Sequence, residues 1–132
     1  MIVTARHLEG SRFEVSSGRH SLITDQLPEY GGTDQGPMAS EIFLFAVASC
    51  FGQSVLHVAK KMRKAATRLA VEVTATKNSS KFCFSEMVIT VKADCDADTL
   101  EKMAALARKY CFVTNSLSGS VNIAHRVCVS GL

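Results

Sequence analysis

Five cysteines are the residues of this 132-residue chain whose type most directly suggests chemistry. They are Cys50, Cys83, Cys95, Cys111 and Cys128. An odd number argues against the disulfide framework of a small secreted protein. No CxxC motif occurs, and no Cys/His pair has zinc-finger spacing, so the sequence does not predict a structural metal site. The thiols are therefore buried and inert, reactive, or a mixture of the two, and their positions in the sequence are the next evidence.

Two of the five thiols fall on predicted helix faces that must point inward. Cys50 lies at the end of the apolar run Ile42 to Phe51. Cys111 continues an apolar stripe with i, i+3, i+4, i+7 and i+11 spacing in a second predicted helix. Thiols on two packed helices could meet, but position alone leaves open that both are simply core residues. Cys83, Cys95 and Cys128, in or next to predicted strands, are expected to be buried or tolerated thiols.

The helix that carries Cys50 is predicted from the stretch Met38 to Phe51, which contains no Gly or Pro, and we extend it to about Arg63. Ala39 or Ser40 can supply its start, with Glu41 near the positive end of its dipole. Because the helix is apolar on almost all sides, it must be buried all round. A lone chain of this length struggles to wrap such a helix, so we expect a second chain to help.

The rest of the chain reads as short strands and one more helix. A loop rich in Gly and Pro covers Asp25 to Pro37, and a change of alternation near Glu86-Met87 predicts a bulge. Asp96 is the predicted N-cap of the second helix. The order βββ-α-ββ-α-β indicates a single α+β domain over residues 1–132. The strands are expected over residues 2–8, 12–15, 20–24, 69–76, 82–93 and 121–129.

Composition describes an ordinary globular protein, with 47% hydrophobic and 20% charged residues and a net charge of +3. The basic residues after the long helix lack interleaved aromatic residues, which argues against nucleic-acid binding. Polar residues interrupt the apolar stretch, so we do not expect it to span a membrane. The N-terminus does not resemble a signal peptide, and a cytoplasmic location is expected. The interrupting residues are Gly52, Gln53, Ser54 and His57.

Two motifs carry a resemblance to a known family. The loop Gly31-Gly32-Thr33-Asp34-Gln35-Gly36-Pro37, followed by Glu41 and by an apolar run ending in Ala48-Ser49-Cys50, resembles the OsmC-like (osmotically inducible protein C) family. That family includes the organic hydroperoxide resistance proteins. The stretch Leu106 to Cys111 followed by Asn115-Ser116-Leu117 is similar to the family's second cysteine motif. The resemblance covers essentially the whole chain.

The resemblance implies an intertwined homodimer in which antiparallel sheets wrap around long central helices. It also implies a cysteine-based peroxidase that needs no metal or organic cofactor and that takes part in oxidative-stress defence. Cys50 matches the peroxidatic thiol and Cys111 the resolving thiol. An organic hydroperoxide would oxidise Cys50 to a sulfenic acid, and Cys111 would condense with it to a disulfide. A dithiol donor, such as a lipoyl-bearing protein, would then reduce the disulfide.

In the hydroperoxide resistance members an arginine and a glutamate lower the pKa of the reactive thiol. Glu41 lies nine residues before Cys50, where those members have ten, and this places it on the opposite side of a straight helix. It can act only through a kink or from the partner chain, and is otherwise a first-turn carboxylate that favours the dipole. The candidate arginines are Arg6, Arg12 and Arg19. Phe112 stands where relatives commonly carry Pro.

Two other functions stay open at this point. The first is a binding module with an apolar ligand at the dimer interface and spectator thiols. The second is a redox sensor or thiol carrier without fast peroxide turnover. Aromatic residues near the thiols (Phe43, Phe45, Phe51, Phe112) favour an apolar peroxide over hydrogen peroxide. His57 stands two helical turns, about 10 Å, from Cys50 and is expected to be a core or interface residue rather than a catalytic partner.

Overall fold

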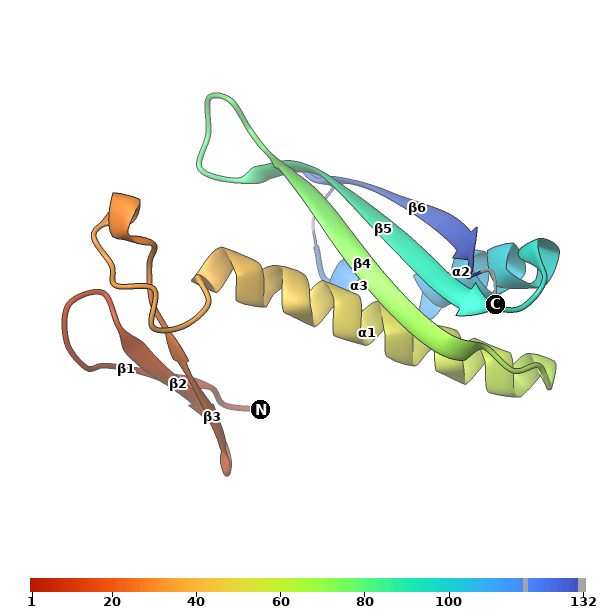
Figure 1. Ribbon diagram of the computed structural model, residues 1–132, viewed down its shortest axis with the longest axis horizontal. Coiled ribbons are helices and arrows are strands. Elements are labelled where there is room, and N and C mark those ends of the chain that lie inside the picture. The colour runs from red at the N-terminus through yellow and green to blue at the C-terminus, as the bar shows by residue number, and fades with distance from the viewer. Residues whose placement is uncertain (118, 131–132) are drawn as a thin grey trace. The chain divides into compact units, whose positions relative to one another are not determined.

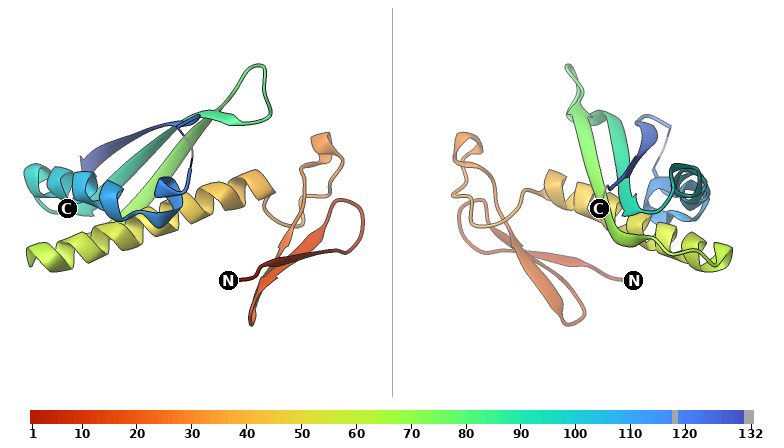
Figure 2. Two further views of the ribbon diagram at one scale, coloured as in Figure 1. Left: turned by 180° about the vertical axis from the view of Figure 1, so that it is seen from behind. Right: turned by 45° about the vertical axis from the view of Figure 1, so that its right-hand side comes forward.

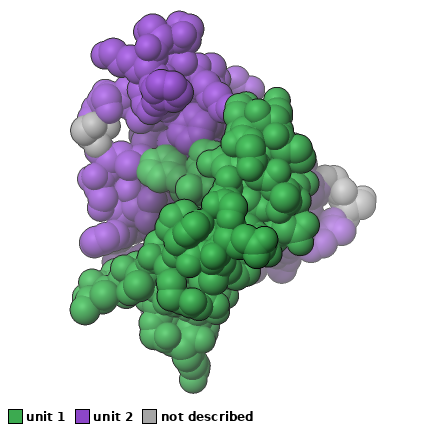
Figure 3. Space-filling view, turned by 90° about the vertical axis from the view of Figure 1, so that its left-hand side faces the viewer, with its two compact units in different colours: residues 1–43 green, residues 44–132 purple. Residues whose placement is uncertain are grey.

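The computed structural model describes residues 1–117 and 119–130 and divides into two compact units. The N-terminal unit comprises residues 1–43 and the C-terminal unit residues 44–132, and Figure 3 colours the two separately. The helix predicted from Met38 onward begins in the first unit and continues into the second. The mixture of strands and helices confirms the α+β class.

The N-terminal unit is built on a three-stranded antiparallel meander. Its strands are β1 (Thr4–His7), β2 (Phe13–Ser17) and β3 (His20–Thr24), with β2 in the middle. Gly10 and Gly18 occupy the connecting turns with φ of 57° and 58°, a backbone conformation that glycine adopts without strain. All three predicted strands are present, although β1 begins later than expected.

The glycine-rich loop after β3 is organised by one buried carboxylate. Asp25 is only 3% exposed, and its two oxygens accept hydrogen bonds from the backbone N–H groups of Gln26, Thr33 and Gln35 at 2.7 to 3.1 Å. The hydroxyl of Thr33 adds a fourth at 2.9 Å. These bonds, that from the Gln35 N–H first, lower the pKa of Asp25 to about 2. The loop also contains a short 3₁₀ helix, η1 (Pro28–Tyr30), that the sequence did not predict.

Two glycines in this loop are required by close backbone contacts. A Cβ at Gly32 would lie 2.0 Å from the carbonyl oxygen of Gln26, and one at Gly36 would lie 2.1 Å from that of Ile23. No side chain fits in either place. Gly32 and Gly36 therefore allow the loop backbone to lie against Gln26 and the end of β3.

Helix α1 (Ala39–Met62) begins with a reciprocal cap. The Met38 carbonyl accepts from the N–H of Glu41 and of Ile42, while the Glu41 carboxylate accepts from the Met38 N–H at 3.1 Å. This bond gives Glu41 a structural role in the first turn. At the other end Arg63 adopts φ of 54°, and the Lys64 N–H bonds to the Ala59 carbonyl, which closes the helix at Met62.

The C-terminal unit contains a second three-stranded sheet, formed by β4 (Thr67–Lys77), β5 (Phe84–Asp94) and β6 (Asn122–Val129) with β5 in the middle (Figure 1). β4 and β5 are antiparallel as expected. The expectation of an antiparallel sheet is wrong for β6, which runs parallel to β5. The reason is the crossover: helices α2 (Ala97–Tyr110) and α3 (Phe112–Asn115) carry the chain back to the end at which β5 begins.

Helices α1 and α2 pack on the same face of this sheet, as the two views of Figure 2 show. Gly52 of α1 lies close to β4, because a Cβ there would be 3.4 Å from the Val71 side chain. The opposite face is largely polar and carries the ion pair between Lys92 and Glu72 at 3.0 Å. The fully buried residues of the core are Val47, Phe51, Val55, Met87, Ile89, Val91, Ala93, Leu100, Met103, Ala104, Ala107 and Cys111.

Two local predictions for this unit are confirmed. Asp96 caps α2 by accepting from the Thr99 N–H at 2.8 Å. The ladder passes from Thr76 opposite Glu86 to Lys77 opposite Phe84, so Ser85 is an extra residue and the bulge lies next to its predicted position.

The single chain does not bury α1 on every side, as expected of a lone chain of this length. The sheet covers one face only, and on other faces Phe45 is 55% and Leu56 53% exposed. By length and composition alone α1 could also cross a membrane, since it has 24 residues and a mean hydropathy of 1.8 over its most apolar window. A helix with one packed and one open apolar face needs a further covering surface.

Candidate functional site

The two thiols singled out by the sequence are neighbours in the C-terminal unit. Cys50 lies half-buried in the middle of α1, and Cys111 lies fully buried at the junction of α2 and α3. At Cys111 the backbone leaves the helical conformation, with φ of −77° and ψ of 98°, so this residue ends one helix and precedes the next. The helical faces thus bring the pair together, as their inward positions suggested.

The environment of Cys111 disfavours its thiolate. Burial raises the pKa of this thiol, and hydrogen-bond and charge interactions with Cys50 raise it further. Hydrogen bonds from the side chain and backbone of Thr114, in the first turn of α3, act in the opposite direction. The sum keeps Cys111 protonated at neutral pH beside the more accessible thiol of Cys50.

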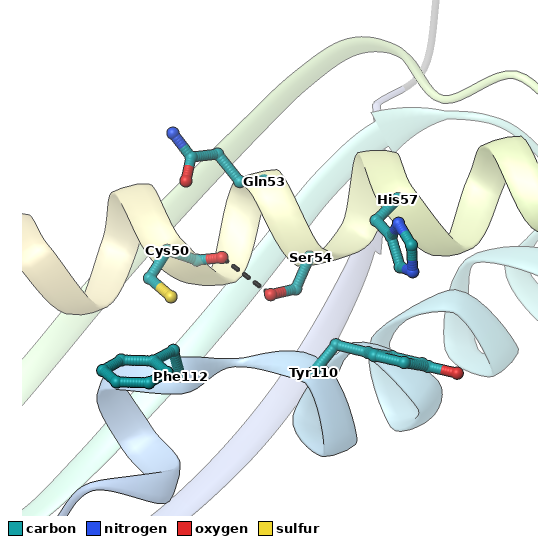
Figure 4. A pocket seen from close by; sticks show the side chains of 6 residues that line it. All are labelled: Cys50, Gln53, Ser54, His57, Tyr110 and Phe112. Atoms are coloured by element: carbon teal, nitrogen blue, oxygen red, sulfur yellow. Dashed lines mark hydrogen bonds between the residues drawn. The ribbon is translucent and has the colours of Figure 1, made fainter.

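An open pocket of about 370 Å³ is lined in part by Cys50, whereas Cys111 is not among its lining residues. Figure 4 shows Cys50, Ser54 and His57 on α1 facing Phe112 and Tyr110 on the opposite wall. The Ser54 hydroxyl donates to the Cys50 carbonyl oxygen at 2.8 Å and is thereby engaged with the helix backbone. The lining residues are Cys50, Gln53, Ser54, His57, Tyr110 and Phe112.

At the end of the pocket away from Cys50, the lining residues His57 and Tyr110 form a cluster with Lys61, which does not itself line the pocket. The rings of His57 and Tyr110 meet edge to face with centroids 5.0 Å apart. The Lys61 ammonium lies 4.8 Å over the Tyr110 ring and 3.3 Å from the Tyr110 hydroxyl oxygen. We call Lys61, Tyr110 and His57 the distal cluster. His57 is exposed on the pocket wall, so it is not a core residue of the single chain, and its expected place at an interface stays a prediction.

Sequence reasoning missed most of this pocket. Tyr110 and Lys61 are 49 residues apart, and no local pattern predicts their contact. A usable signal was the helical spacing: Cys50, Ser54, His57 and Lys61 recur at i, i+4, i+7 and i+11, which is one face of α1. The position of Tyr110 directly before Cys111 was the other signal.

The charged residues proposed as helpers belong to the N-terminal unit. Glu41 caps α1, as described above. Arg6 pairs with Glu14 at 3.0 Å and Arg12 with Glu9 at 3.3 Å. Arg19 lies in the turn between β2 and β3. The roles of these residues toward Cys50 remain predictions.

The other three cysteines lie apart from this arrangement. Cys83 and Cys128 are exposed, so for these the buried interpretation is wrong, and both are tolerated surface thiols. Cys95 is half-buried, and burial together with the charges of Asp96 and Asp94 raises its pKa. In the part of the chain that the structure describes, no three His, Cys, Asp or Glu side chains are grouped so as to hold a metal ion.

Comparison with known structures gives the same fold at low sequence identity. An OsmC-like protein from Mycoplasma pneumoniae is 18% identical with a TM-score of 0.88, over 98% of this chain and 96% of that one. An organic hydroperoxide resistance protein OsmC from Legionella pneumophila is 21% identical with a TM-score of 0.77, over 97% and 96%. The organic hydroperoxide resistance protein OhrB of Bacillus subtilis is 23% identical with a TM-score of 0.71, over 96% of both chains. No curated protein matches.

A family model agrees with these structural neighbours. Residues 32–126 match the model described as OsmC-like protein. This span runs from the glycine-rich loop through both thiols to β6, and it includes residues of both compact units. The chain therefore belongs to the OsmC-like family.

Proposed function

We propose that this protein is a thiol-dependent peroxidase that reduces organic hydroperoxides and serves in oxidative-stress defence in the cytoplasm. The observation that carries the proposal is the thiol pair: Cys50 opens into a pocket, and Cys111 is buried next to it. The names of two structural neighbours, both organic hydroperoxide resistance proteins, support the same activity. Since the family model includes residues of both compact units, we take these to act as one domain.

The reaction consumes one peroxide and two thiols. The Cys50 thiolate attacks the distal oxygen of the hydroperoxide, the O–O bond breaks, and the alkoxide leaves and is protonated to the alcohol. Cys50 becomes a sulfenic acid. The sulfur of Cys111 then attacks the sulfur of Cys50, a disulfide forms, and water leaves. A dithiol reductant, for instance a lipoyl-bearing protein, reduces this disulfide, is itself oxidised to a disulfide, and restores both thiols.

The two thiols differ in access, and this difference supports the proposed roles. A peroxide in the pocket reaches Cys50 first, because Cys111 is fully buried and is not part of the lining. The raised pKa of Cys111 keeps it from competing as a nucleophile. The Thr114 hydrogen bonds favour its thiolate and so assist its later attack on the sulfenic acid.

The pocket favours an apolar peroxide. Phe112, which replaces the family's common proline, is 75% exposed, and its ring forms one wall. Covering this ring with a hydrocarbon substrate removes apolar area from water, at about 25 cal/mol per Å². Hydrogen peroxide gains nothing from such contact. We therefore expect organic hydroperoxides to be the better substrates.

A second copy of the chain would cover the exposed apolar face of α1 that carries Phe45 and Leu56. We propose a homodimer for this reason, with α1 as a core helix of the assembly rather than a membrane span. Glu41 and one of Arg6, Arg12 or Arg19, from either copy, would stabilise the Cys50 thiolate.

The test is reductant-driven turnover of cumene hydroperoxide and of hydrogen peroxide by purified protein. The wild-type protein should reduce cumene hydroperoxide faster than hydrogen peroxide. Dihydrolipoamide should be a better reductant than a monothiol, because its oxidation forms a cyclic disulfide. Cys50→Ser should lose roughly three orders of magnitude in rate, whereas the surface control Cys83→Ser should not change. Equal, background rates in wild type and Cys50→Ser would contradict the peroxidase and leave the binding module and the redox sensor as the remaining functions.

A further inference from the structure

Helix α2 carries exposed lysines on one of its sides. Lys102 and Lys109 stand at i and i+7, so they lie on the same side of the helix. Leu106 and Tyr110 lie next to them on that side and are 37% and 47% exposed. This side of α2 therefore presents positive charge and apolar area to solvent together. The buried residues of α2, which lie on a different side, are Leu100, Met103, Ala104 and Ala107.

Helix α1 contributes a third ammonium group to this surface. The Nζ atom of Lys61 lies 4.8 Å from the centre of the Tyr110 ring and 3.3 Å from the Tyr110 hydroxyl oxygen. Lys60 is also exposed, but it follows Leu56 by about one helical turn and so lies on the apolar side of α1. We call the surface that these side chains form the basic face. It consists of Lys61, Lys102, Leu106, Lys109 and Tyr110.

The lysines of the basic face are not neutralised by carboxylates of the same chain. Among residues 1–117 and 119–130, no carboxylate lies within ion-pair distance of Lys61, Lys102 or Lys109. Glu101 is next to Lys102 in the sequence, but its carboxylate contacts the Nε2 atom of His125 on β6 at 2.8 Å. The positive charge of the basic face is therefore available to a partner.

The basic face borders the pocket that Cys50 lines. Tyr110 belongs to both, since it lines the pocket and contacts Lys61. Cys50 and Lys61 stand at i and i+11 on α1, which corresponds to about 16 Å at 1.5 Å per residue. A protein bound to the basic face must therefore extend a reacting group over about this distance to reach the thiol. A group at the end of a long side chain can do so, because the pocket is open.

We infer that the basic face docks an acidic protein that carries the reducing dithiol on an extended side chain. This inference rests on the proposed peroxidase function, because it names the partner of the reductive step. Carboxylates of such a partner complement the three ammonium groups of the basic face. Leu106 and Tyr110 supply apolar contact area among the charges, as in the centre of other protein interfaces.

The reductive step takes place at Cys50, since Cys50 lines the pocket and Cys111 is fully buried. One thiolate of the partner attacks the Sγ atom of Cys50, the disulfide breaks, and Cys111 leaves as a thiolate that takes up a proton. The second thiolate of the partner then attacks the first partner sulfur, and Cys50 leaves and is protonated in the same way. The partner ends as a disulfide, and both cysteines are reduced.

Two synthetic reductants isolate the effect of charge. Each is a short peptide with one lysine acylated by dihydrolipoic acid, flanked by Asp and Glu in the acidic peptide and by Asn and Gln in the neutral peptide. With cumene hydroperoxide as oxidant, kcat/KM of the wild-type protein should be about tenfold higher for the acidic peptide. This preference should disappear at high salt. Equal kcat/KM for the two peptides at low salt would overturn the inference.

Variants test whether this preference comes from the basic face. The double variant Lys102→Met/Lys109→Met should lower the ratio of the two kcat/KM values about fivefold, and Lys61→Met should lower it about twofold. The matched control is Lys60→Met/Lys81→Met, which removes the same charge as the first double variant from α1 and from the hairpin between β4 and β5 (Figure 1). The control should keep the wild-type ratio. Equal ratios in the two double variants would overturn the inference.

A binding measurement separates the basic face from the peroxidase chemistry. Calorimetric titration uses the same two peptides with an octanoyl group in place of the dihydrolipoyl group, so that no thiol reacts. The acidic peptide should bind Lys102→Met/Lys109→Met about fivefold more weakly than it binds wild type and the control. If dihydrolipoamide supports no turnover but this pattern holds, the peroxidase fails and the docking surface stands.

Two results of the titration would refute the docking surface even in an active peroxidase. The first is equal binding of the acidic peptide to wild type and to both double variants. The second is tighter binding of an oligo-dT strand than of the acidic peptide, with the strand sensitive to Lys102→Met/Lys109→Met, because the basic face would then select nucleic acid.

Discussion

The loop around Asp25 and the pocket beside Cys50 both contain polar groups, but only the loop holds a buried carboxylate that internal hydrogen bonds satisfy. Asp25 is buried, and four donors from three residues saturate its carboxylate. The pocket is open, and it presents a thiol, an imidazole, a phenol and an aromatic ring to solvent. A buried carboxylate whose hydrogen-bonding capacity is used within the protein stabilises the fold. Polar and reactive groups that are accessible to solvent remain available to a ligand. Changes in the loop should therefore affect stability, and changes in the pocket should affect chemistry.

The largest effect on stability is expected for Gly32→Ala. Its Cβ would meet the Gln26 carbonyl at 2.0 Å, so the backbone must shift and the hydrogen bonds to Asp25 must weaken. We expect a loss of about 3 kcal/mol in the free energy of unfolding, measured by urea denaturation. Gly119→Ala is the matched control, because nothing lies within 4 Å of its Cβ. Equal urea concentrations at the unfolding midpoint of the two variants would show that the loop backbone around Gly32 is not tightly packed.

Cys111→Ala tests the other region of the comparison, the thiol pair beside the pocket, where chemistry should change more than stability. Removing one buried sulfur should cost about 1 kcal/mol or less of stability. The chemistry should change more: with no resolving thiol, the Cys50 sulfenic acid should persist after peroxide treatment and react with dimedone, as mass spectrometry would detect. Absence of the dimedone adduct in Cys111→Ala, under conditions that oxidise wild type, would contradict the assignment of Cys50 as nucleophile.

Acid should weaken the loop around Asp25. The folded-state pKa of Asp25, about 2, lies below its ordinary value of 3.8, so the charged form stabilises the fold. This contribution is complete above pH 3.8 and is lost as the pH falls toward about 2. Asp25→Asn should lower the free energy of unfolding at neutral pH and make this free energy less dependent on pH in this range. A wild-type profile no steeper than that of the variant would contradict the role of Asp25.

The smallest effect on stability is expected for the surface arginines. The Arg6 and Glu14 side chains are 66% and 37% exposed, so Arg6→Gln should change the free energy of unfolding by less than about 0.5 kcal/mol. The same is expected of Arg12→Gln and Arg19→Gln. The arginine that serves Cys50 should stand out by a slower reaction of the thiol with cumene hydroperoxide at unchanged stability. If none of the three slows it, no N-terminal arginine activates the thiol.

Local patterns were sufficient for much of the fold and for the thiol pair. The cap at Asp96, the bulge near Glu86 and the inward faces of Cys50 and Cys111 all depend on neighbours within a few residues. Two features could not be predicted. The direction of β6 depends on the crossover, and the Lys61–Tyr110 contact joins two helices. Each of these is decided by tertiary packing, which local periodicity does not encode.

Intact mass and peptide mapping of the reduced protein after one equivalent of cumene hydroperoxide test the central claim most directly. The account predicts rapid loss of two hydrogens, mapped to a disulfide between Cys50 and Cys111, with no such change in Cys50→Ser and a slower reaction with hydrogen peroxide. If both thiols remain reduced while the peroxide persists, Cys50 is not a peroxidatic nucleophile and the catalytic account is wrong.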